Sequence, residues 1–376
     1  MIAAAIVVLA AVLAFANGAN DVSKGVATLV GSGVTSYRRA IVWGTAWTAV
    51  GAALAAIAAG AMLARFGSGL YAAGITPSLP AVVGALVGAG LWVLIATRSG
   101  LPVSTTHALV GAVVGAGVTA LGAHAIAWPA LTTKVALPLI VSPFVAMALT
   151  HLVSRGLTRG FGPAATGADC VCVSPADCAP VATAIGTAFA LSATTSLVIT
   201  AADSATCAID QPAAARVTTT HMHWLSSGAV SFARGLNDAP KIAGLSLAAG
   251  ALIPAATTLG QGATFALITA GIVAGSIAAG RRVTRVLAED VTPMNHREGF
   301  AANLVTAGLV SAGAVYGWPM STTHVSAGSI MAIGADRGSL DRRTARNLVL
   351  AWVVTLPAAA ALGALSAILA RVVLGA

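Results

Sequence analysis

The chain has 376 residues, of which 57% are hydrophobic and only 8% are charged. Soluble domains carry about 25% charged residues, so this composition excludes an ordinary soluble enzyme or binding domain. The formal net charge of +9 does not indicate a nucleic-acid partner, because basic residues of membrane proteins gather in cytoplasmic loops. We therefore predict an all-α polytopic protein of the lipid bilayer, in a cell membrane of the bacterial inner-membrane type.

The first apolar run, Ile2 to Ala16, leads directly into the polar motif Gly18-Ala19-Asn20-Asp21-Val22-Ser23-Lys24. A carboxylate and an ammonium at membrane depth are costly unless they have partners, so such residues are usually functional. Glycines on both sides predict a break in the helix, which frees backbone groups to act as ligands. The run has no basic n-region, so we interpret it as part of the mature protein and not as a cleaved signal.

Five further apolar runs are long enough to cross roughly 30 Å of hydrocarbon. In chain order they are Ala40 to Ala64, Leu131 to Val153, Val181 to Ala202, Ala263 to Gly280 and Asn347 to Ala370. A second motif, Gly100-Leu101-Pro102-Val103-Ser104-Thr105-Thr106-His107, lies between the first two of these runs. Ser and Thr are preferred N-caps, so it predicts a helix N-terminus whose free amides and hydroxyls suit an oxyanion.

Both motifs occur twice, and the copies are Gly235 to Lys241 and Gly317 to His324. One common shift along the sequence, called here the repeat shift, takes Asn20 to Asn237 and Ser104 to Ser321. A shift shared by two separate motifs indicates an internal duplication. We predict a first half at residues 1–160, a cysteine-containing linker with one extra transmembrane helix at 161–215, and a second half at 216–376.

Equivalent loops of the two halves have opposite charge bias. The loop at 36–39 has two arginines and its copy at 254–262 has none, whereas 337–346 is strongly basic and its counterpart 120–130 has no Lys or Arg. Under the positive-inside rule, these loops lie on opposite sides of the membrane. The sequence thus predicts an inverted-repeat secondary transporter with broken or re-entrant helices, in which each half makes four crossings and the central helix completes the inversion.

In an inverted repeat, the two hydroxyl clusters would meet near the midplane and hold a tetrahedral anion between them. The clusters are Ser104, Thr105 and Thr106 in the first half and Ser321, Thr322 and Thr323 in the second. Lys24 and Lys241 partly balance Asp21 and Asp238, so a bound anion still calls for cations or protons. We interpret His107 and His324 as structural hydrogen-bond donors.

The four paired motifs resemble those of the inorganic phosphate transporter (PiT) family, and Met294 to Asn303 is similar to a further family segment. The resemblance covers nearly the whole chain apart from the linker. It implies phosphate uptake coupled to sodium or protons, homodimers, and no cofactor. It also implies that Asp21 and Asp238, with Asn20 and Asn237, bind the coupling cation, that the asparagines also contact the substrate, and that the Ser and Thr clusters bind the anion.

Two features leave alternatives open. Lys24 departs from the more familiar form of the motif, and its ammonium could replace a bound sodium ion, which favours proton coupling. Some family members carry sulfate, although the protonatable phosphate suits the Asp pair better. A membrane-embedded hydrolase or phosphotransferase is a minor alternative, because every candidate residue has a twin, whereas catalysis needs unequal partners.

Three cysteines of the linker, Cys170, Cys172 and Cys178, form the one cluster of potential soft-metal ligands. Three thiols without a histidine make a weak metal site, so we predict no metal centre and an inert cytoplasmic loop. Cys207 is expected in an external loop, Asp203 to Ala215, on the opposite face.

Overall fold

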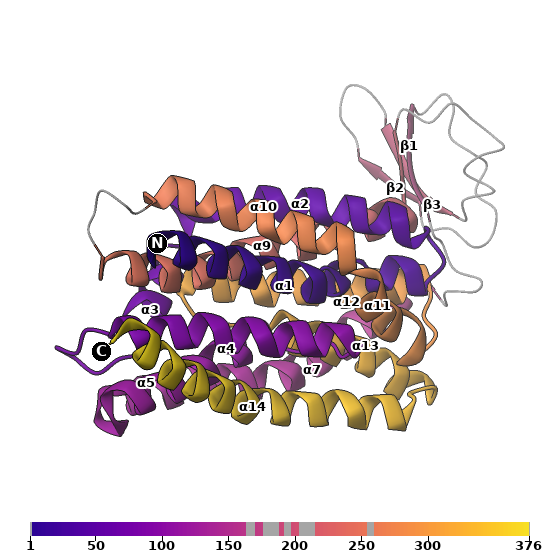
Figure 1. Ribbon diagram of the computed structural model, residues 1–376. Coiled ribbons are helices and arrows are strands. Elements are labelled where there is room, and N and C mark those ends of the chain that lie inside the picture. Colours follow the sequence, from indigo (N-terminus) through magenta and orange to yellow (C-terminus); the bar gives the residue numbers. More distant parts are fainter. Residues whose placement is uncertain are drawn as a thin grey trace.

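A computed structural model describes residues 2–162, 170–175, 188–191, 197–202, 215–253 and 259–375. In these ranges the chain forms a bundle of long helices with a small β-sheet at one end (Figure 1). Seven of the helices are long and apolar enough to cross a membrane. The prediction of an all-α polytopic membrane protein is confirmed.

The two halves contain the same main helices in the same order. The first half comprises α1 (Ile2–Gly31), α2 (Tyr37–Ala58), α3 (Gly60–Gly67), α4 (Leu79–Arg98), α5 (Thr105–Leu121), α6 (Trp128–Leu131) and α7 (Leu137–Phe161). The second comprises α9 (Thr219–Gly250), α10 (Gln261–Ala279), α11 (Arg281–Arg285), α12 (His296–Tyr316), α13 (Thr322–Arg337) and α14 (Arg342–Leu374). The first residues of α1 and α9, of α4 and α12, and of α5 and α13 are each separated by the repeat shift, so the duplication extends to the architecture.

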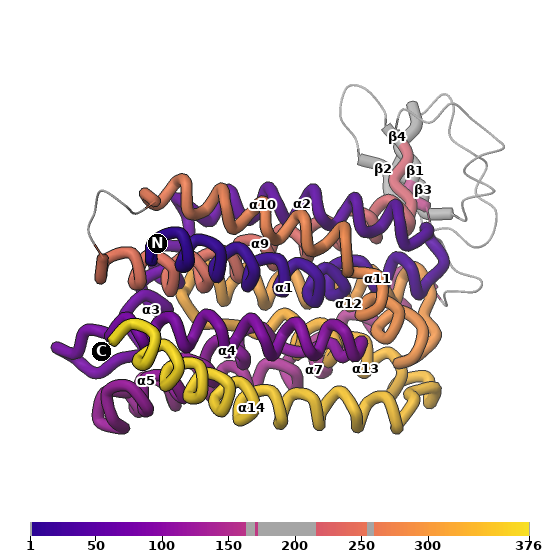
Figure 2. Tube along the Cα trace, viewed as in Figure 1, coloured from indigo at the N-terminus to yellow at the C-terminus, as the bar shows by residue number. Residues whose placement is uncertain are grey.

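The two halves run in opposite directions. Along α1, Ala11 lies near Gly271 and Val22 near Gly280, so α1 and α10 are parallel, and Figure 2 shows them side by side. Likewise Trp43 lies near Gly228 and Ala52 near Gly235, so α2 and α9 are parallel. Because a short loop makes α2 antiparallel to α1, α1 and its copy α9 have opposite directions. This is the geometry of an inverted repeat.

In each half, the second motif lies at the tip of a helical hairpin. The outer ends of the α4–α5 hairpin are joined, since the amide of Ala72 donates to Ala125 O at 2.9 Å. The outer ends of α12 and α13 are joined in the same way, by the amide of Asp341 and Val291 O at 3.0 Å. Because each hairpin begins and ends on the same side of the membrane, it adds no net crossing. Each half therefore crosses the membrane an odd number of times. The inversion therefore needs no central helix.

The predicted break at the Asn-Asp motifs is wrong, because α1 and α9 are continuous through both. Gly18 and Gly25 do not break α1; they let it pack closely, against Ile272 and Ser231. Pro240 removes one backbone hydrogen bond inside α9 without ending the helix. The chain breaks instead at the Pro-containing segments before α5 and α13.

The predicted helix from Val181 to Ala202 is also wrong. Its described parts are strands β2 (Ala188–Leu191) and β3 (Leu197–Ala202), which form an antiparallel sheet of order β2-β3-β1-β4 with β1 (Cys170–Pro175) and β4 (Ala215–Thr218). The run is rich in Thr, Val and Ile, which favour strands, and hydropathy alone does not distinguish the two.

The sheet also bears on the linker cysteines. Strands β3 and β4, which flank the predicted Asp203 to Ala215 loop, belong to one sheet with β1. Residues 203–214, including Cys207, and Cys178 lie outside the described residues. Cys170 and Cys172 lie on β1, and a metal-ion cluster is not found among the described residues.

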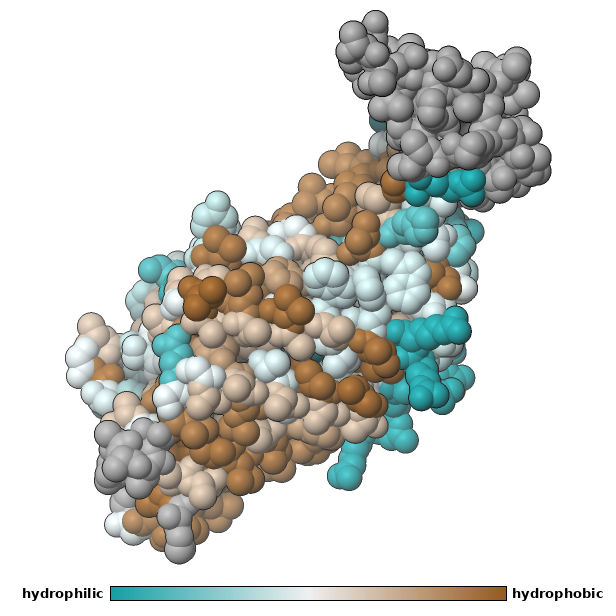
Figure 3. Space-filling view, turned by 90° about the horizontal axis from the view of Figure 1, so that it is seen from above, coloured by the Kyte–Doolittle hydropathy of each residue, from teal (hydrophilic) through white to brown (hydrophobic). Residues whose placement is uncertain are grey.

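Basic residues of the described ranges gather at one end of the bundle, called here the basic end. They are Arg38, Arg39, Arg98, Arg155, Arg159, Arg216, Arg281, Arg282, Arg285, Arg297, Arg337, Arg342, Arg343 and Arg346. The opposite end has Arg65, Lys134 and Arg371. Figure 3 shows hydrophilic residues at the basic end and a hydrophobic surface along the bundle. The positive-inside rule therefore predicts that the basic end faces the cytoplasm.

Replacing Gly275 with alanine is expected to destabilise the bundle. A Cβ there would overlap Phe15 O of α1, and such overpacking costs about 1–3 kcal/mol. Gly308 is the matched control, because a Cβ there meets nothing within 4 Å and Gly→Ala favours a helix by about 1 kcal/mol. Thermal unfolding in detergent should show a lower melting temperature for Gly275→Ala only; equal melting temperatures would contradict this packing.

Candidate functional site

The two Asp-containing motifs form one site. Asn17 Nδ2 donates to Asp21 Oδ2 at 3.0 Å and to Asp238 Oδ2 at 3.2 Å, so the carboxylates of the two halves share a donor. Both carboxylates are buried, on α1 and α9 respectively. The convergence arises because these helices cross with opposite directions, which brings the middle of each against the middle of the other.

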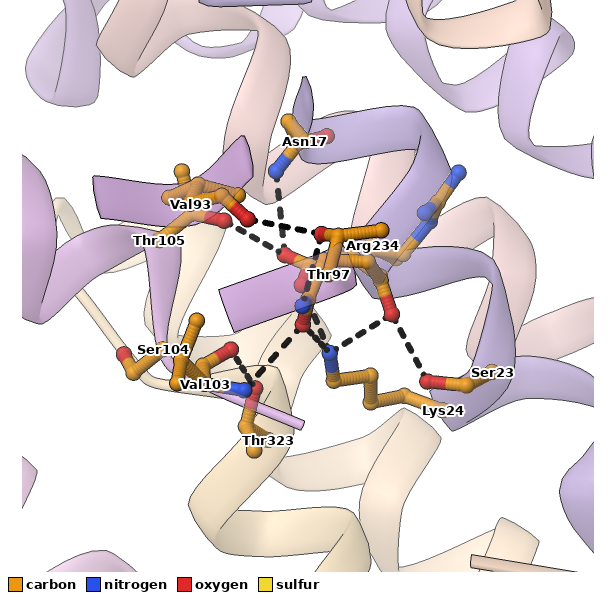
Figure 4. Close-up of polar contacts among 12 residues, drawn as sticks. Asn17, Ser23, Lys24, Val93, Thr97, Val103, Ser104, Thr105, Arg234 and Thr323 are labelled. Atoms are coloured by element: carbon orange, nitrogen blue, oxygen red, sulfur yellow. Dashed lines mark hydrogen bonds and ion pairs between the residues drawn. The ribbon is translucent and has the colours of Figure 1, made fainter. Parts of the chain in front are cut away.

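In the first half, the ammonium of Lys24 is held by three oxygens. Its Nζ donates to Asn20 O at 2.9 Å, Asn20 Oδ1 at 2.7 Å and Asp21 Oδ1 at 2.7 Å. Asn20 also donates to Thr97 Oγ1 and Leu101 O, and its Oδ1 accepts the amide of Val103. These contacts fix the α4–α5 hairpin onto α1. Figure 4 shows Asn17, Lys24, Thr97 and Val103 in this network.

The second half repeats the arrangement with different partners. Lys241 Nζ donates to Thr106 Oγ1 at 2.6 Å, Met320 O at 3.1 Å and Asp238 Oδ1 at 3.2 Å. Asn237 donates to Asp238 and to Met320 O, but its Oδ1 has no partner within the described chain. The position equivalent to Thr97 is Ala314, which removes one of the polar contacts that Asn20 makes.

The helices α5 and α13 meet at their N-termini. Ser104 and Ser321 act as N-caps, each accepting the amide of the following His at 3.2 Å. Thr106 Oγ1 donates to Met320 O at 3.2 Å, and the mirrored Thr323 Oγ1 donates to Val103 O at 2.8 Å. The two hairpin tips are thus locked together by reciprocal hydrogen bonds.

The remaining hydroxyls differ between the halves. Thr105 Oγ1 donates to Asp21 Oδ2 at 3.1 Å, whereas its copy, Thr322 Oγ1, is buried with no partner in the described ranges. The His107 and His324 rings stack at 4.4 Å between centroids, and His324 Nδ1 lies 3.2 Å from Leu139 O. His107 Nδ1 and His324 Nε2 have no hydrogen-bond partner among the described residues, so the donor role expected for the two histidines stays a prediction.

Two site residues were not predicted from the sequence, Asn17 and Arg234, which occupy equivalent positions one turn before the two aspartates. Arg234 is 1% exposed. Its Nη2 lies 3.4 Å from Ser276 Oγ, while Nε and Nη1 have no hydrogen-bond partner among the described residues. The repeat shift aligns Arg234 with Asn17, and a charged residue in a membrane helix is a signal that could have been read.

Five ionisable side chains are therefore buried together. Their formal charges are two negative, from the aspartates, and three positive, so the cluster has a formal excess of one positive charge. Its members are Asp21, Lys24, Arg234, Asp238 and Lys241, each at most 3% exposed. An uncompensated charge in a low-dielectric interior is costly, so this arrangement favours a bound anion.

The structure brings all the predicted site residues into one region. Ser104 and Ser321 cap their helices, and the other predicted ligands except Thr322 are joined by hydrogen bonds. The hydroxyl of Thr322 is buried and has no partner among the described residues. Two opposed helix N-termini beside paired acidic residues, in an inverted repeat, are the arrangement expected of a membrane transporter of anions.

The chain belongs to the phosphate transporter family, whose sequence pattern it matches over residues 17–363. It is 28% identical to the Arabidopsis thaliana inorganic phosphate transporter 2-1, chloroplastic, across 92% of this chain and 68% of that protein. A Mycobacterium tuberculosis relative that is named as a putative phosphate permease is 36% identical over 110 residues, 29% of this chain and 20% of that protein. That match thus spans about a fifth of the mycobacterial protein's length.

The fold is similar to a solved structure of a sodium-dependent phosphate transporter. The TM-score is 0.77 at 21% identity, and the match covers 99% of both chains. This likeness concerns the fold. The family is one of transporters and not of enzymes, which confirms the prediction that the chain is not an enzyme.

Proposed function

We propose that this protein transports inorganic phosphate together with a proton across the membrane. The observation that carries the proposal is a buried cluster with one excess positive charge at the meeting point of two helix N-termini. The family and the names of its relatives support phosphate as the substrate. Phosphate would lie between α5 and α13, with Thr322 and the amides of both helix starts as its donors, and Arg234 would contribute the positive charge of the cluster.

Charge balance favours phosphate over sulfate. Phosphate is divided between monoanion and dianion near neutral pH and can enter with one negative charge, which neutralises the cluster. Sulfate has no proton to retain and would leave one uncompensated negative charge in a dry site. Such a charge costs several kcal/mol in a protein interior, enough to discriminate strongly between the two ions.

The same balance defines the coupling. A phosphate dianion fits only when a proton is taken up with it, so cation and anion each make the site favourable for the other. Lys24 and Lys241 each place an ammonium among three oxygens, the ligand type that hard cations prefer. Two cation positions are thus filled by tethered charges. We infer that protons and not sodium ions drive transport.

Access to the site would alternate between the two sides of the membrane as the half that contains the α4–α5 hairpin rocks against the half that contains the α12–α13 hairpin. The reciprocal bonds of Thr106 to Met320 O and Thr323 to Val103 O join the two hairpin tips. Either tip can separate from the site while the other keeps its helix N-terminus in place. Homodimers and a bacterial inner-membrane location belong to this proposal, and light scattering of the detergent-solubilised protein measures the assembly.

The substrate is tested by uptake of labelled phosphate into proteoliposomes with sulfate as competitor. We expect phosphate to accumulate and a tenfold excess of sulfate to leave its initial rate nearly unchanged. Transport of sulfate that phosphate does not inhibit would contradict the phosphate assignment.

Replacing Lys24 with alanine is expected to create sodium dependence. The change removes an ammonium and leaves three oxygens, Asn20 O, Asn20 Oδ1 and Asp21 Oδ1, around a space of cation size. Uptake by the variant should increase with external sodium, while uptake by the unmodified protein should not. The matched control is Lys134→Ala, at an exposed lysine outside the site. Sodium dependence in the unmodified protein would refute the role assigned to the tethered ammonium.

A further inference from the structure

A column of buried polar side chains extends from the site toward the basic end of the bundle. It is called here the inner column, and each member is at most 3% exposed. Its members are Thr28 on α1, His223, Ser227 and Ser231 on α9, Asn303 and Thr306 on α12, and Ser326 and Ser329 on α13.

The inner column is continuous with the site at one end. Ser326 Oγ donates to Lys24 O at 3.2 Å, and Ser227 Oγ donates to Gly25 O at 2.6 Å. Farther along, Thr28 Oγ1 donates to Asn303 Oδ1 at 3.1 Å, and Thr306 Oγ1 to Ser329 Oγ at 3.3 Å.

At its other end the column approaches a cavity. His223 lies against Gly299, where a Cβ would overlap its ring. Within one turn of Gly299 on α12, Asn295, Arg297 and Glu298 line a cavity of about 540 Å³ at the basic end. Arg155, Arg159 and His151 also line it, with Asp336. A cleft with this excess of basic groups attracts anions.

The mirrored positions of the other half are all apolar. They are Leu245, Ile6, Ala10, Ala14, Leu86, Ala89, Leu109 and Ala112, in the order of the inner column. Each is at most 4% exposed, and all but Ala10 belong to the main hydrophobic core. The same helix arrangement therefore packs without polar groups, so the fold itself does not require the inner column to be polar.

Polar groups in a membrane interior are costly and mark routes for substrates and ions. Three nitrogens of the inner column, Asn303 Nδ2 and both ring nitrogens of His223, have no partner in the part of the chain described. Unpaired polar atoms of this kind suit a segment that water enters. The mirrored apolar column, in contrast, closes by dry packing.

We propose that the inner column, buried in this conformation, is the half of the transport route that opens to water, through which phosphate and its proton pass between the site and the arginine-lined cavity. The mirrored apolar column is the outer gate. The inference rests on the proposed function for the identity of the solute. The asymmetry makes exposure of the inner half to water less costly than exposure of the outer half, since exposing apolar surface to water is unfavourable.

Thiol accessibility tests the proposal with a matched pair of variants. Ser329→Cys lies in the inner column and Ala112→Cys at the mirrored position, each in full-length protein whose four native cysteines are replaced by serine. A membrane-impermeant methanethiosulfonate reagent is added to the basic-end side or the opposite side of sealed vesicles. We expect the Ser329→Cys thiol to react from the basic-end side at least tenfold faster than the Ala112→Cys thiol reacts from either side, and phosphate to slow it.

Equal rates, or no reaction of the Ser329→Cys thiol, would overturn the proposal. Labelling does not require transport, so a negative labelling result would overturn the proposal even if phosphate uptake is intact. Absence of uptake would overturn the proposed function instead.

A second measurement uses Asn303→Leu, which copies the mirrored Leu86. This variant should lower the maximal uptake rate about tenfold with KM unchanged. A normal maximal rate in a folded Asn303→Leu protein would also contradict the route.

Discussion

Replacing Asp21 with asparagine is expected to reduce concentrative phosphate uptake at least 100-fold. The change removes the negative charge that pairs with Lys24, and it replaces one of the two oxygens that accept from Lys24, Asn17 and Thr105 with a donor NH2 group. Breaking one partner of a buried ion pair costs about 3–5 kcal/mol, which corresponds to more than two powers of ten. Initial uptake rates in proteoliposomes measure the effect, with the exposed Asp290→Asn as control.

A double variant separates loss of uptake caused by misfolding from loss of uptake caused by the missing carboxylate. Asp21→Asn with Lys24→Met removes both charges, so it should recover the melting temperature of the unmodified protein but not its uptake. Full uptake by the folded single variant would refute the role of Asp21 in coupling.

Replacing Arg234 with glutamine is expected to weaken phosphate binding about 100-fold. It removes the excess positive charge, so a bound phosphate monoanion would leave the cluster with a net negative charge. Arg234→Lys should lose less, because it keeps the positive charge although it replaces the planar guanidinium. The KM for uptake and the phosphate-dependent rise in melting temperature both report this binding.

The stability of the Arg234→Gln protein distinguishes a phosphate-binding role of Arg234 from a structural role. Two guanidinium nitrogens have no partner among the described residues, so removing them should leave the melting temperature without phosphate unchanged or higher. A large drop in that temperature, with phosphate affinity preserved, would show that Arg234 serves the fold.

Much of the site could be predicted because the duplication is visible in the sequence. The repeat shift pairs Asn20 with Asn237 and Ser104 with Ser321, and opposite loop charges indicate that the halves are inverted. Together these observations imply that the motifs meet. Serines after a proline also predicted the helix starts, and both act as N-caps in the structure.

The rest required three-dimensional contacts. Glycine permits both a helix break and close helix packing, and Gly18 serves packing because Ile272 lies against it. The run from Val181 is apolar enough for a membrane helix, yet strand pairing takes its described parts into a sheet. Arg234 stands in an otherwise small and apolar stretch, but its lack of partners could not be inferred from sequence.

The most direct measurement imposes proton and sodium gradients separately on proteoliposomes that contain the purified protein and follows labelled phosphate. We expect an inward proton gradient to drive accumulation in sodium-free buffer and internal pH to fall as phosphate enters. Accumulation that occurs only with a sodium gradient, or phosphate entry without any change in internal pH, would contradict proton-coupled transport.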